Sequence, residues 1–154
     1  MRKILLFTAL FSGIGFSLCA QNNSIAKSTY KTAIGIRFFP AGITFKSNSD
    51  HKKSSTEVIA YFKDGFTGAF LHEWNFTLNT TRNLRAYIGA GGHVGFFDEA
   101  SGGGAVLGAD GAIGLDYKFL YLPVNISLDW QPSLQFGKNN DFRGWGGIGA
   151  RLTL

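Results

Sequence analysis

Two of the three histidines lie close to acidic residues, the combination used in general acid–base catalysis. His72 is followed directly by Glu73, but adjacent strand residues point to opposite faces, which excludes a direct dyad. His93 shares a strand face with polar residues and could reach Asp110 or Asp116 on the next strand. Because a lone interfacial histidine and a buried histidine–carboxylate pair are usually structural, we predict no catalytic residues.

Two glycine-rich segments, GAGGHVG (89–95) and SGGGAVLGADG (101–111), imitate the spacing of phosphate-binding loops. Neither is followed by a predicted helix, so no helix N-terminus is available to hold an anion. The single cysteine, Cys19, and the histidines have no metal-ligand spacing. The sequence therefore predicts no cofactor and no metal.

The longest regular pattern is VNISLDWQPSLQF, residues 124–136. Apolar and polar residues alternate over all thirteen positions, which places each set on its own face of a strand. Soluble strands average roughly five or six residues, whereas a tilted strand needs about 9 to 11 to cross a bilayer. This segment is therefore predicted to be a transmembrane strand with its apolar face toward lipid.

Seven further segments of strand character are separated by turn signals such as Asp64-Gly65. The predicted strands are 31–39, 43–47, 55–63, 66–78, 84–97, 105–119, 124–136 and 145–154. An even strand number is typical of single-chain outer-membrane barrels, and eight strands leave an interior that side chains can fill. The predicted fold is all-β, an eight-stranded antiparallel up-and-down transmembrane β-barrel.

The predicted inward faces carry as many acidic as basic residues. This predicted lumen polar network consists of Arg37, Lys46, Glu57, Glu73, Arg85, His93, Asp110, Asp116, Lys118, Asp129 and Arg151. Buried charges must be paired, whereas one sign is expected to dominate an ion-selective pore. The balance predicts a closed lumen. Its expected centre is Arg85, Asp110, Asp116, Asp129 and Arg151, on the fifth to eighth strands.

Aromatic residues gather near the predicted strand ends, as they do in the girdles at membrane interfaces. The predicted interface aromatics are Phe38, Phe62, Phe66, Trp74, Phe96, Tyr117, Phe119, Trp130, Phe136 and Trp145.

The first residues have the pattern of a secretory signal: basic Arg2 and Lys3, an apolar stretch, and a small residue at Ala20. We expect residues 1–20 to be a cleaved signal peptide, 21–29 a short polar lead and 30–154 the barrel domain. Acylation on Cys19 is the alternative, disfavoured because Leu18 precedes it. Although the sequence pI is near 9.5, the basic residues form no single cluster, so we expect no nucleic-acid binding.

The pattern resembles the small eight-stranded outer-membrane barrels of the OmpA/OmpX type, and more closely a family of short exported barrel proteins. The matching segments are GIRF (35–38), GITFK (42–46), YIGAGGHVGFFD (87–98), GADGAIGLDYKF (108–119) and residues 124–136. The resemblance implies an outer-membrane location with both termini in the periplasm, and it supplies no catalytic residues. The sequence departs from it by ending on Leu154 rather than on an aromatic residue.

The expected function is structural and non-enzymatic. The expected partners are outer-membrane lipid and, during insertion, the outer-membrane assembly machinery, and the barrel is expected to be a monomer. One alternative is a soluble, lipocalin-like periplasmic barrel that binds a small apolar ligand, with Val124, Ile126, Leu128 and Trp130 inside. Two others are a lipid-modifying enzyme centred on His72 or His93, and a narrow channel.

Overall fold

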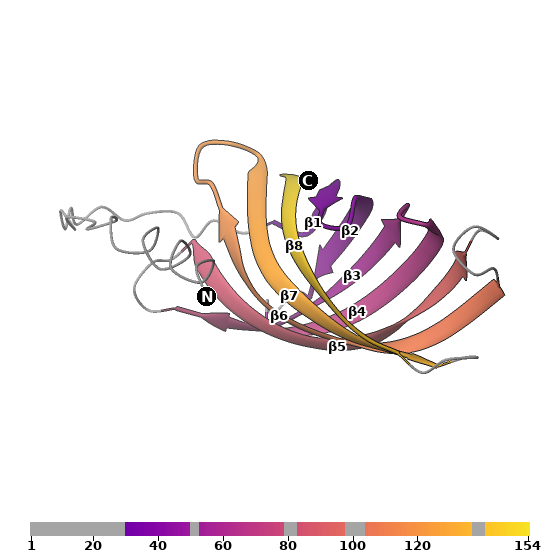
Figure 1. Cartoon of the computed structure of the whole chain (residues 1–154). Coiled ribbons are helices and arrows are strands. Elements are labelled where there is room, and N and C mark those ends of the chain that lie inside the picture. Colours follow the sequence, from indigo (N-terminus) through magenta and orange to yellow (C-terminus); the bar gives the residue numbers. More distant parts are fainter. Residues whose placement is uncertain (1–29, 50–52, 79–82, 98–103, 137–140) are drawn as a thin grey trace, which may run out of the picture.

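The computed structural model describes residues 30–49, 53–78, 83–97, 104–136 and 141–154. The strands are β1 (Thr32–Phe38), β2 (Gly42–Asn48), β3 (Ser54–Tyr61), β4 (Gly65–Thr77), β5 (Leu84–Phe97), β6 (Gly104–Lys118), β7 (Val124–Phe136) and β8 (Asp141–Thr153). Each pairs antiparallel with the next, and β8 pairs with β1, so that the sheet closes (Figure 1). The predicted all-β, eight-stranded up-and-down barrel is confirmed. The described ranges contain no helix long and apolar enough to cross a membrane.

The strand boundaries differ from the predicted ones chiefly in β8, which begins at Asp141 and not at Trp145. Asp141 pairs with Gln135 of β7, so residues predicted as a loop continue the sheet. The Asp64-Gly65 turn was predicted correctly, and both residues have positive φ angles, 59° and 129°. The predicted signal peptide and the polar lead lie outside the described residues.

The registers show how steeply the strands wind around the barrel. The chain of Cα partners that starts at Ile34 runs through Phe45, Val58, Phe70, Gly92, Ala109 and Leu134 to Phe142. Across the closing seam, however, Ile34 pairs with Leu152, ten residues further along β8. A stagger of this kind requires strands tilted by about 35–45° to the barrel axis.

The barrel wall is not equally tall all the way round. β1 and β2 have seven residues and β3 has eight, whereas β4 to β8 have 13 to 15. At one end, which we call the terminal end, the backbones of Thr32 and Leu154 exchange two hydrogen bonds. At the opposite, open end, β8 continues over residues 141–147 beyond the last partner that β1 offers. The wall is therefore low at the open end, over β1 and β2.

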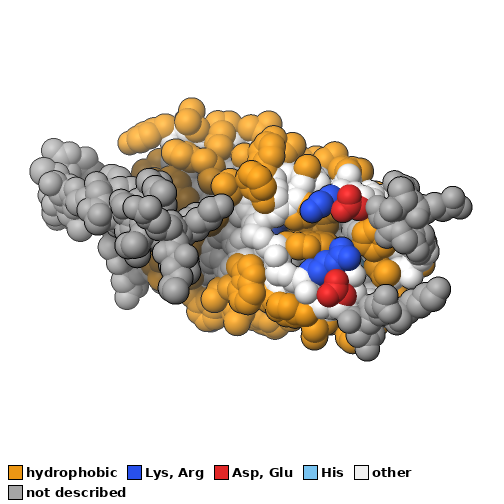
Figure 2. All heavy atoms as spheres, viewed as in Figure 1, with side chains coloured by type: hydrophobic (Ala, Val, Ile, Leu, Met, Phe, Trp, Pro, Cys, Tyr) orange, Lys and Arg blue, Asp and Glu red, His pale blue; other side chains and the backbone are white. Residues whose placement is uncertain are grey.

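Side chains alternate between the lumen and the outer face along every strand, as the pleat requires. In β7, Asn125, Ser127 and Asp129 are buried, while Ile126 and Leu128 are exposed on the outside. The outer surface is consequently dominated by hydrophobic side chains, and the face drawn in Figure 2 also shows a small area with basic and acidic side chains. The lumen contains the polar side chains that the chain has to bury.

Candidate functional site: the lumen

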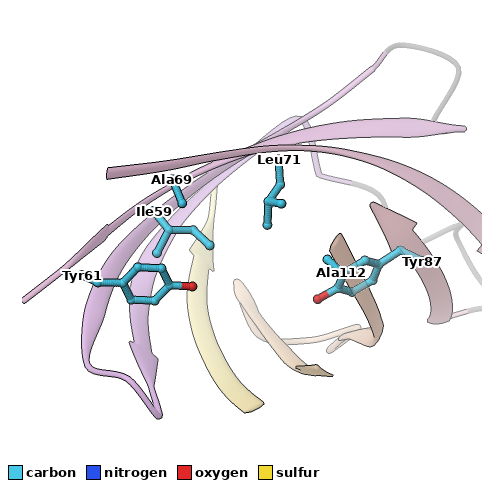
Figure 3. Packing of buried hydrophobic residues seen from close by; sticks show 6 residues of the cluster. All are labelled: Ile59, Tyr61, Ala69, Leu71, Tyr87 and Ala112. Carbon is cyan, nitrogen blue, oxygen red and sulfur yellow. The ribbon is translucent and has the colours of Figure 1, made fainter. Parts of the chain in front are cut away.

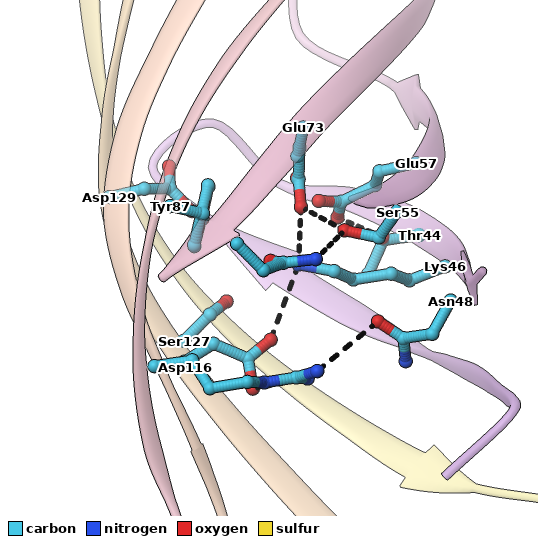
Figure 4. A network of polar contacts seen from close by, with 12 residues as sticks. Thr44, Lys46, Asn48, Ser55, Glu57, Glu73, Tyr87, Asp116, Ser127 and Asp129 are labelled. Atoms are coloured by element: carbon cyan, nitrogen blue, oxygen red, sulfur yellow. Dashed lines mark hydrogen bonds and ion pairs between the residues drawn. The ribbon is translucent and has the colours of Figure 1, made fainter. Parts of the chain in front are cut away.

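Lys46 is the centre of the ion-pair network in the half of the lumen next to the terminal end. Its Nζ lies 2.6 Å from Glu73 Oε2 and 3.2 Å from Asp116 Oδ2, and all three side chains are fully enclosed (Figure 4). The Ser55 hydroxyl donates to the same Glu73 oxygen at 2.8 Å. The ammonium also lies 4.4 Å from the centroid of the Tyr87 ring, within cation–π range. One cation thus joins β2, β4 and β6 across the lumen.

Arg151 of β8 is the second buried cation of this half. Its Nη2 donates to Glu57 Oε1 of β3 at 2.5 Å, and Nη1 donates to Ser127 Oγ at 2.9 Å and Asn125 Oδ1 at 3.2 Å. The Thr44 hydroxyl donates to the same Glu57 oxygen. Charge-assisted bonds of this kind are about twice as strong as neutral ones, so the guanidinium holds opposite walls together.

Tyr30, just before β1, lies at the edge of the network and donates to Asp116 Oδ2 at 3.1 Å. Burial, reinforced by the Asp116 carboxylate, raises the pKa of the Tyr30 phenol. The phenol therefore remains a hydrogen-bond donor over the physiological pH range.

Arg37 and Asp129 form a further buried ion pair, which lies closer to the open end than Lys46 and Arg151 do. The Arg37 guanidinium contacts both Asp129 oxygens, with Nη1 3.0 Å from Oδ2. The Tyr87 hydroxyl donates to Asp129 Oδ2 at 2.7 Å, and the Tyr61 hydroxyl donates to Gln131 Oε1 at 2.7 Å. The two-point geometry is specific to arginine and fixes the orientation of the guanidinium.

A small apolar cluster fills the space between these polar groups. It consists of Ile59, Tyr61, Ala69, Leu71, Tyr87 and Ala112 (Figure 3). Tyr87 contacts both Lys46 and Asp129, whereas Tyr61 packs its ring edge against Trp145 at 5.1 Å between centroids. Apolar and polar contacts together close this part of the lumen to solvent.

Two inward-facing glycines make room for large lumen side chains. A Cβ on Gly147 would collide with the Arg37 guanidinium, and a Cβ on Gly108 would collide with the His93 ring. At both positions the missing side chain leaves space that a larger lumen side chain occupies.

His93, Asp110 and Ser133 form a separate buried group. His93 Nδ1 lies 2.9 and 3.0 Å from the two Asp110 oxygens, and the Ser133 hydroxyl is 3.4 Å from the same nitrogen. His93 Nε2 is buried and has no protein partner among the described residues. A catalytic triad needs the carboxylate and the hydroxyl on different ring nitrogens. This arrangement orients the imidazole but does not activate the serine.

At the open end the lumen widens into a cavity of about 1200 Å³. Aromatic side chains of Tyr61, Phe97 and Trp145 form much of its wall, and Thr67 adds a hydroxyl. Of the ion-pair network described above, Asp129 alone contributes to this lining, within the described residues. The lumen is therefore hollow on one side of the Arg37–Asp129 pair and filled on the other.

The structure places the predicted lumen residues in three groups rather than in one network. The first group holds Lys46, Glu57, Glu73, Arg85, Asp116 and Arg151; the second holds Arg37 and Asp129; the third holds His93 and Asp110. Lys118 joins none of them, because its Nζ donates to the backbone carbonyls of Phe119 and Leu122, both at 2.7 Å.

The centre of the network differs from the predicted one. Arg85 lies at the edge, 3.4 Å from both Asp116 and Asn48, with its side chain 16% exposed. Asp110 belongs to the histidine group. The predicted centre contains only residues of the fifth to eighth strands, whereas Lys46 of β2 reaches Glu73 and Asp116 from the opposite wall.

The predicted interface aromatics lie on the outer face with one exception. Phe38, Phe62, Phe66, Phe96 and Phe136 are exposed toward the open end, while Trp74, Tyr117 and Phe119 lie toward the terminal end. Trp130 is exposed too, but it lies in the middle of β7. The prediction for Trp145 was wrong, because it faces the lumen and packs against Tyr61 and His93.

The predicted network contains only ionisable residues and leaves out the neutral side chains that complete it. The principal ones are Tyr30, Thr44, Asn48, Ser55, Tyr61, Tyr87, Asn125, Ser127 and Gln131. Strand parity was a usable signal, because the neutral residues that lie within strands are on the same face as the charged residues. Parity also places Trp145 on the same face as Arg151, six residues later. Parity cannot identify which opposite wall each side chain reaches.

His72, the other candidate for chemistry, faces outward and packs against Trp74, with 5.1 Å between ring centroids. Glu73 points into the lumen, so the two are on opposite faces as predicted. Within the described residues, no group of three or more His, Cys, Asp or Glu side chains could hold a metal ion.

No protein-family model and no curated protein matches the sequence. A search of solved structures finds similarity to the crystal structure of Neisserial surface protein A, with a TM-score of 0.48 and 13% sequence identity. The alignment covers 80% of this chain and 93% of that one. So distant a similarity says nothing about a ligand or an activity.

Proposed function

We propose that the chain is a small integral outer-membrane β-barrel with a lumen closed by its ion-pair network, and that its role is structural. The observation that carries this proposal is the distribution of charge over the wall. Every Asp, Glu, Lys and Arg of the eight strands lies on the lumen face, and the outer face of the strands has none. A lysine or arginine facing mid-bilayer lipid costs about 2–4 kcal/mol, so such a distribution is expected of a membrane wall.

The outer face is also strongly hydrophobic. Thirty large hydrophobic side chains of the described residues are exposed, and each of the eight strands carries at least one of them. Soluble monomers rarely expose a contiguous apolar patch larger than a few hundred Å². A soluble, lipocalin-like barrel would have its apolar face inside, whereas Ile126, Leu128 and Trp130 lie outside.

The packed half of the lumen favours a closed barrel over a channel. Lys46 and Arg151 cross it, Arg37 lies at its upper boundary, and all three are at most 2% exposed. Ions would have to displace buried pairs to pass, and removing one partner of such a pair costs about 3–5 kcal/mol. We therefore expect a non-conducting monomer, surrounded by outer-membrane lipid and inserted by the assembly machinery, with no catalytic activity.

Membrane fractionation, followed by electrophoresis of boiled and unboiled samples, tests the location and the fold together. The expected result is a protein in the outer-membrane fraction whose mobility shifts on boiling, because a closed barrel resists detergent. A soluble periplasmic protein without a shift would contradict the proposal.

A lysine placed on the outer face tests the membrane wall directly. Ile113→Lys is in the middle of β6 and should reduce the free energy of unfolding in lipid vesicles by about 2–4 kcal/mol. Ser47→Lys, on the outer face near the terminal end, is the matched control and should cost about 0–1 kcal/mol. Equal and small effects would indicate that the outer face is in water.

Planar-bilayer recording separates the closed barrel from the narrow channel. No conductance steps above background are expected from the purified full chain. Steady, voltage-dependent steps that disappear when the protein is omitted would favour the channel.

A further inference from the structure

The short strands β1 and β2 leave part of the barrel wall too low to span the membrane. β1 and β2 have seven residues each, fewer than the roughly 9 to 11 that a tilted strand needs to cross a bilayer. The strands are level at the terminal end, where Thr32 and Leu154 are hydrogen-bonded, so the shortfall lies at the open end. Above β1 and β2 the hydrophobic belt therefore continues on β4 to β8 but is interrupted on this side.

The cavity of the open end extends through this interruption. Its lining includes lumen-facing Tyr61 and Trp145, the turn residue Phe39, and Gly146 and Ile148 on the outer face of β8. A cavity lined by both faces of one strand must pass around the edge of that strand. We call this passage, bounded by the 39–41 turn and by residues 144–148, the lateral notch.

The lateral notch combines apolar walls with polar margins. The β1–β8 pairing ends at Ile148, so the β8 edge over residues 141–147 has no β1 partner. Backbone groups left unpaired in hydrocarbon cost several kcal/mol each, so this edge requires polar surroundings. Lys63 and Arg143 add two cationic side chains to the same lining, which also contains the carboxylates of Asp64 and Asp129. Asp129 is neutralised by Arg37, and Arg143, although paired with Asp141 at 3.1 Å, remains 41% exposed. An occupant that fits both parts has a long apolar chain and an anionic head.

We propose that the lateral notch admits a long-chain fatty acid from the surrounding leaflet into the upper lumen, an inference that rests on the proposed membrane insertion. The acyl chain lies along the aromatic wall formed by Tyr61 and Trp145. The carboxylate lies at the rim, where Arg143 and Lys63 offer charge-assisted hydrogen bonds. The cavity volume of about 1200 Å³ is slightly above the range of about 300–1,000 Å³ that is typical of small-molecule sites. Like those sites, the cavity is lined mainly by apolar groups.

Tryptophan quenching by a brominated fatty acid can test the proposal. In the full chain in lipid nanodiscs, the double substitution Trp74→Phe, Trp130→Phe leaves Trp145 in the cavity as the sole described tryptophan. Dibrominated stearic acid should quench it saturably, because bromine acts only at close contact. Arg143→Gln should weaken this quenching several-fold.

A substitution that fills the notch provides the decisive comparison. A Cβ on Gly146 would have no atom closer than Asp129 O at 4.0 Å, so Gly146→Phe should fold and should weaken fatty-acid binding by roughly tenfold. Gly68→Phe is the matched control on the outer face of β4, where the nearest atom lies at 3.9 Å, and it should leave binding unchanged. If Gly146→Phe does not fold, Gly146→Leu takes its place.

Several results would overturn the proposal. These are an unquenched Trp145, quenching that rises without saturation and ignores Gly146→Phe, or a chain dimer that Gly146→Phe abolishes. The last would make the notch an interface with a second copy.

A companion variant separates this failure from a failure of membrane insertion. Trp145→Phe retains Trp74 and Trp130 on the outer face, and phospholipid brominated on its acyl chains should quench both. If Trp74 and Trp130 are quenched but Trp145 does not respond to the fatty acid, only the proposal for the lateral notch fails. If neither Trp145 nor the outer-face Trp74 and Trp130 are quenched, the proposed membrane insertion itself fails.

Discussion

The two halves of the lumen are lined by the same strands, but one is filled by side chains and the other contains a cavity. Toward the terminal end, Lys46 and Arg151 cross the lumen to carboxylates on opposite walls and leave it filled. Toward the open end, Tyr61 and Trp145 line a cavity of about 1200 Å³. The alternation of side chains is equally regular in both halves, so strand pattern alone does not decide whether a lumen is filled.

The difference lies in the length and charge of the inward side chains. A guanidinium or ammonium on a long stem reaches across an eight-stranded barrel and meets a carboxylate, whereas aromatic rings remain near the wall that carries them. The filled half should therefore dominate the stability of the barrel, and the hollow half should tolerate change. The following three substitutions test that comparison.

Lys46→Ala should have the largest effect. It leaves the Glu73 and Asp116 carboxylates without the cation between them, and breaking a buried ion pair costs about 3–5 kcal/mol. Urea titration in detergent micelles gives the free energy of unfolding, with the folded fraction at each urea concentration measured from the mobility shift on boiling. Arg143→Ala at the open end, paired with Asp141 at 3.1 Å and 41% exposed, is the control and should cost less than about 1 kcal/mol. Similar losses from the two variants would contradict the comparison.

Arg85→Ala should have an intermediate effect. Its contacts with Asn48 and Asp116 are both 3.4 Å long, and Lys46 still neutralises Asp116 when Arg85 is removed. The expected loss is about 1–2 kcal/mol in the same urea titration. A loss as large as that of Lys46→Ala would place Arg85 at the centre of the network after all.

Tyr61→Phe should have the smallest effect of the three. It removes one hydrogen bond, 2.7 Å long, to Gln131 Oε1 at the boundary of the cavity, and leaves the ring contact with Trp145 in place. The expected loss is about 0.5–1.5 kcal/mol, as for an ordinary hydrogen bond. A thermal unfolding midpoint that fell as far as with Lys46→Ala would show that the hollow half is as important as the filled one.

The fold could be predicted because each strand carries its own evidence. In residues 124–136 the alternation identifies both faces, and Asp64-Gly65 marks a turn whose positive φ angles suit those residues. β8 is harder to predict, because Gly144, Gly146 and Gly147 contribute no side chains to the alternation, so the predicted strand begins four residues later than the observed one.

The arrangement of the lumen could be predicted only in part, because contacts across it depend on the stagger. Parity identifies Lys46 as inward-facing, but its contact with Asp116, seventy residues away, follows from the ten-residue offset around the closed sheet. A flat sheet with the same pairings would place these two side chains on distant strands. Local sequence contains no measure of that offset.

The seam between β1 and β8 also constrains the order in which the barrel can form. Ala33 pairs with Thr153, 120 residues later, and this is the last pairing that a chain made from its N-terminus can complete. Closing so long a loop is entropically costly and slow. Until it closes, β1 and the growing C-terminal edge are both unpaired, and either can accept a strand from another chain. The yield of closed barrels should therefore fall as refolding concentration rises, even though β1 and residues 148–153 of β8 are paired with each other in the finished barrel.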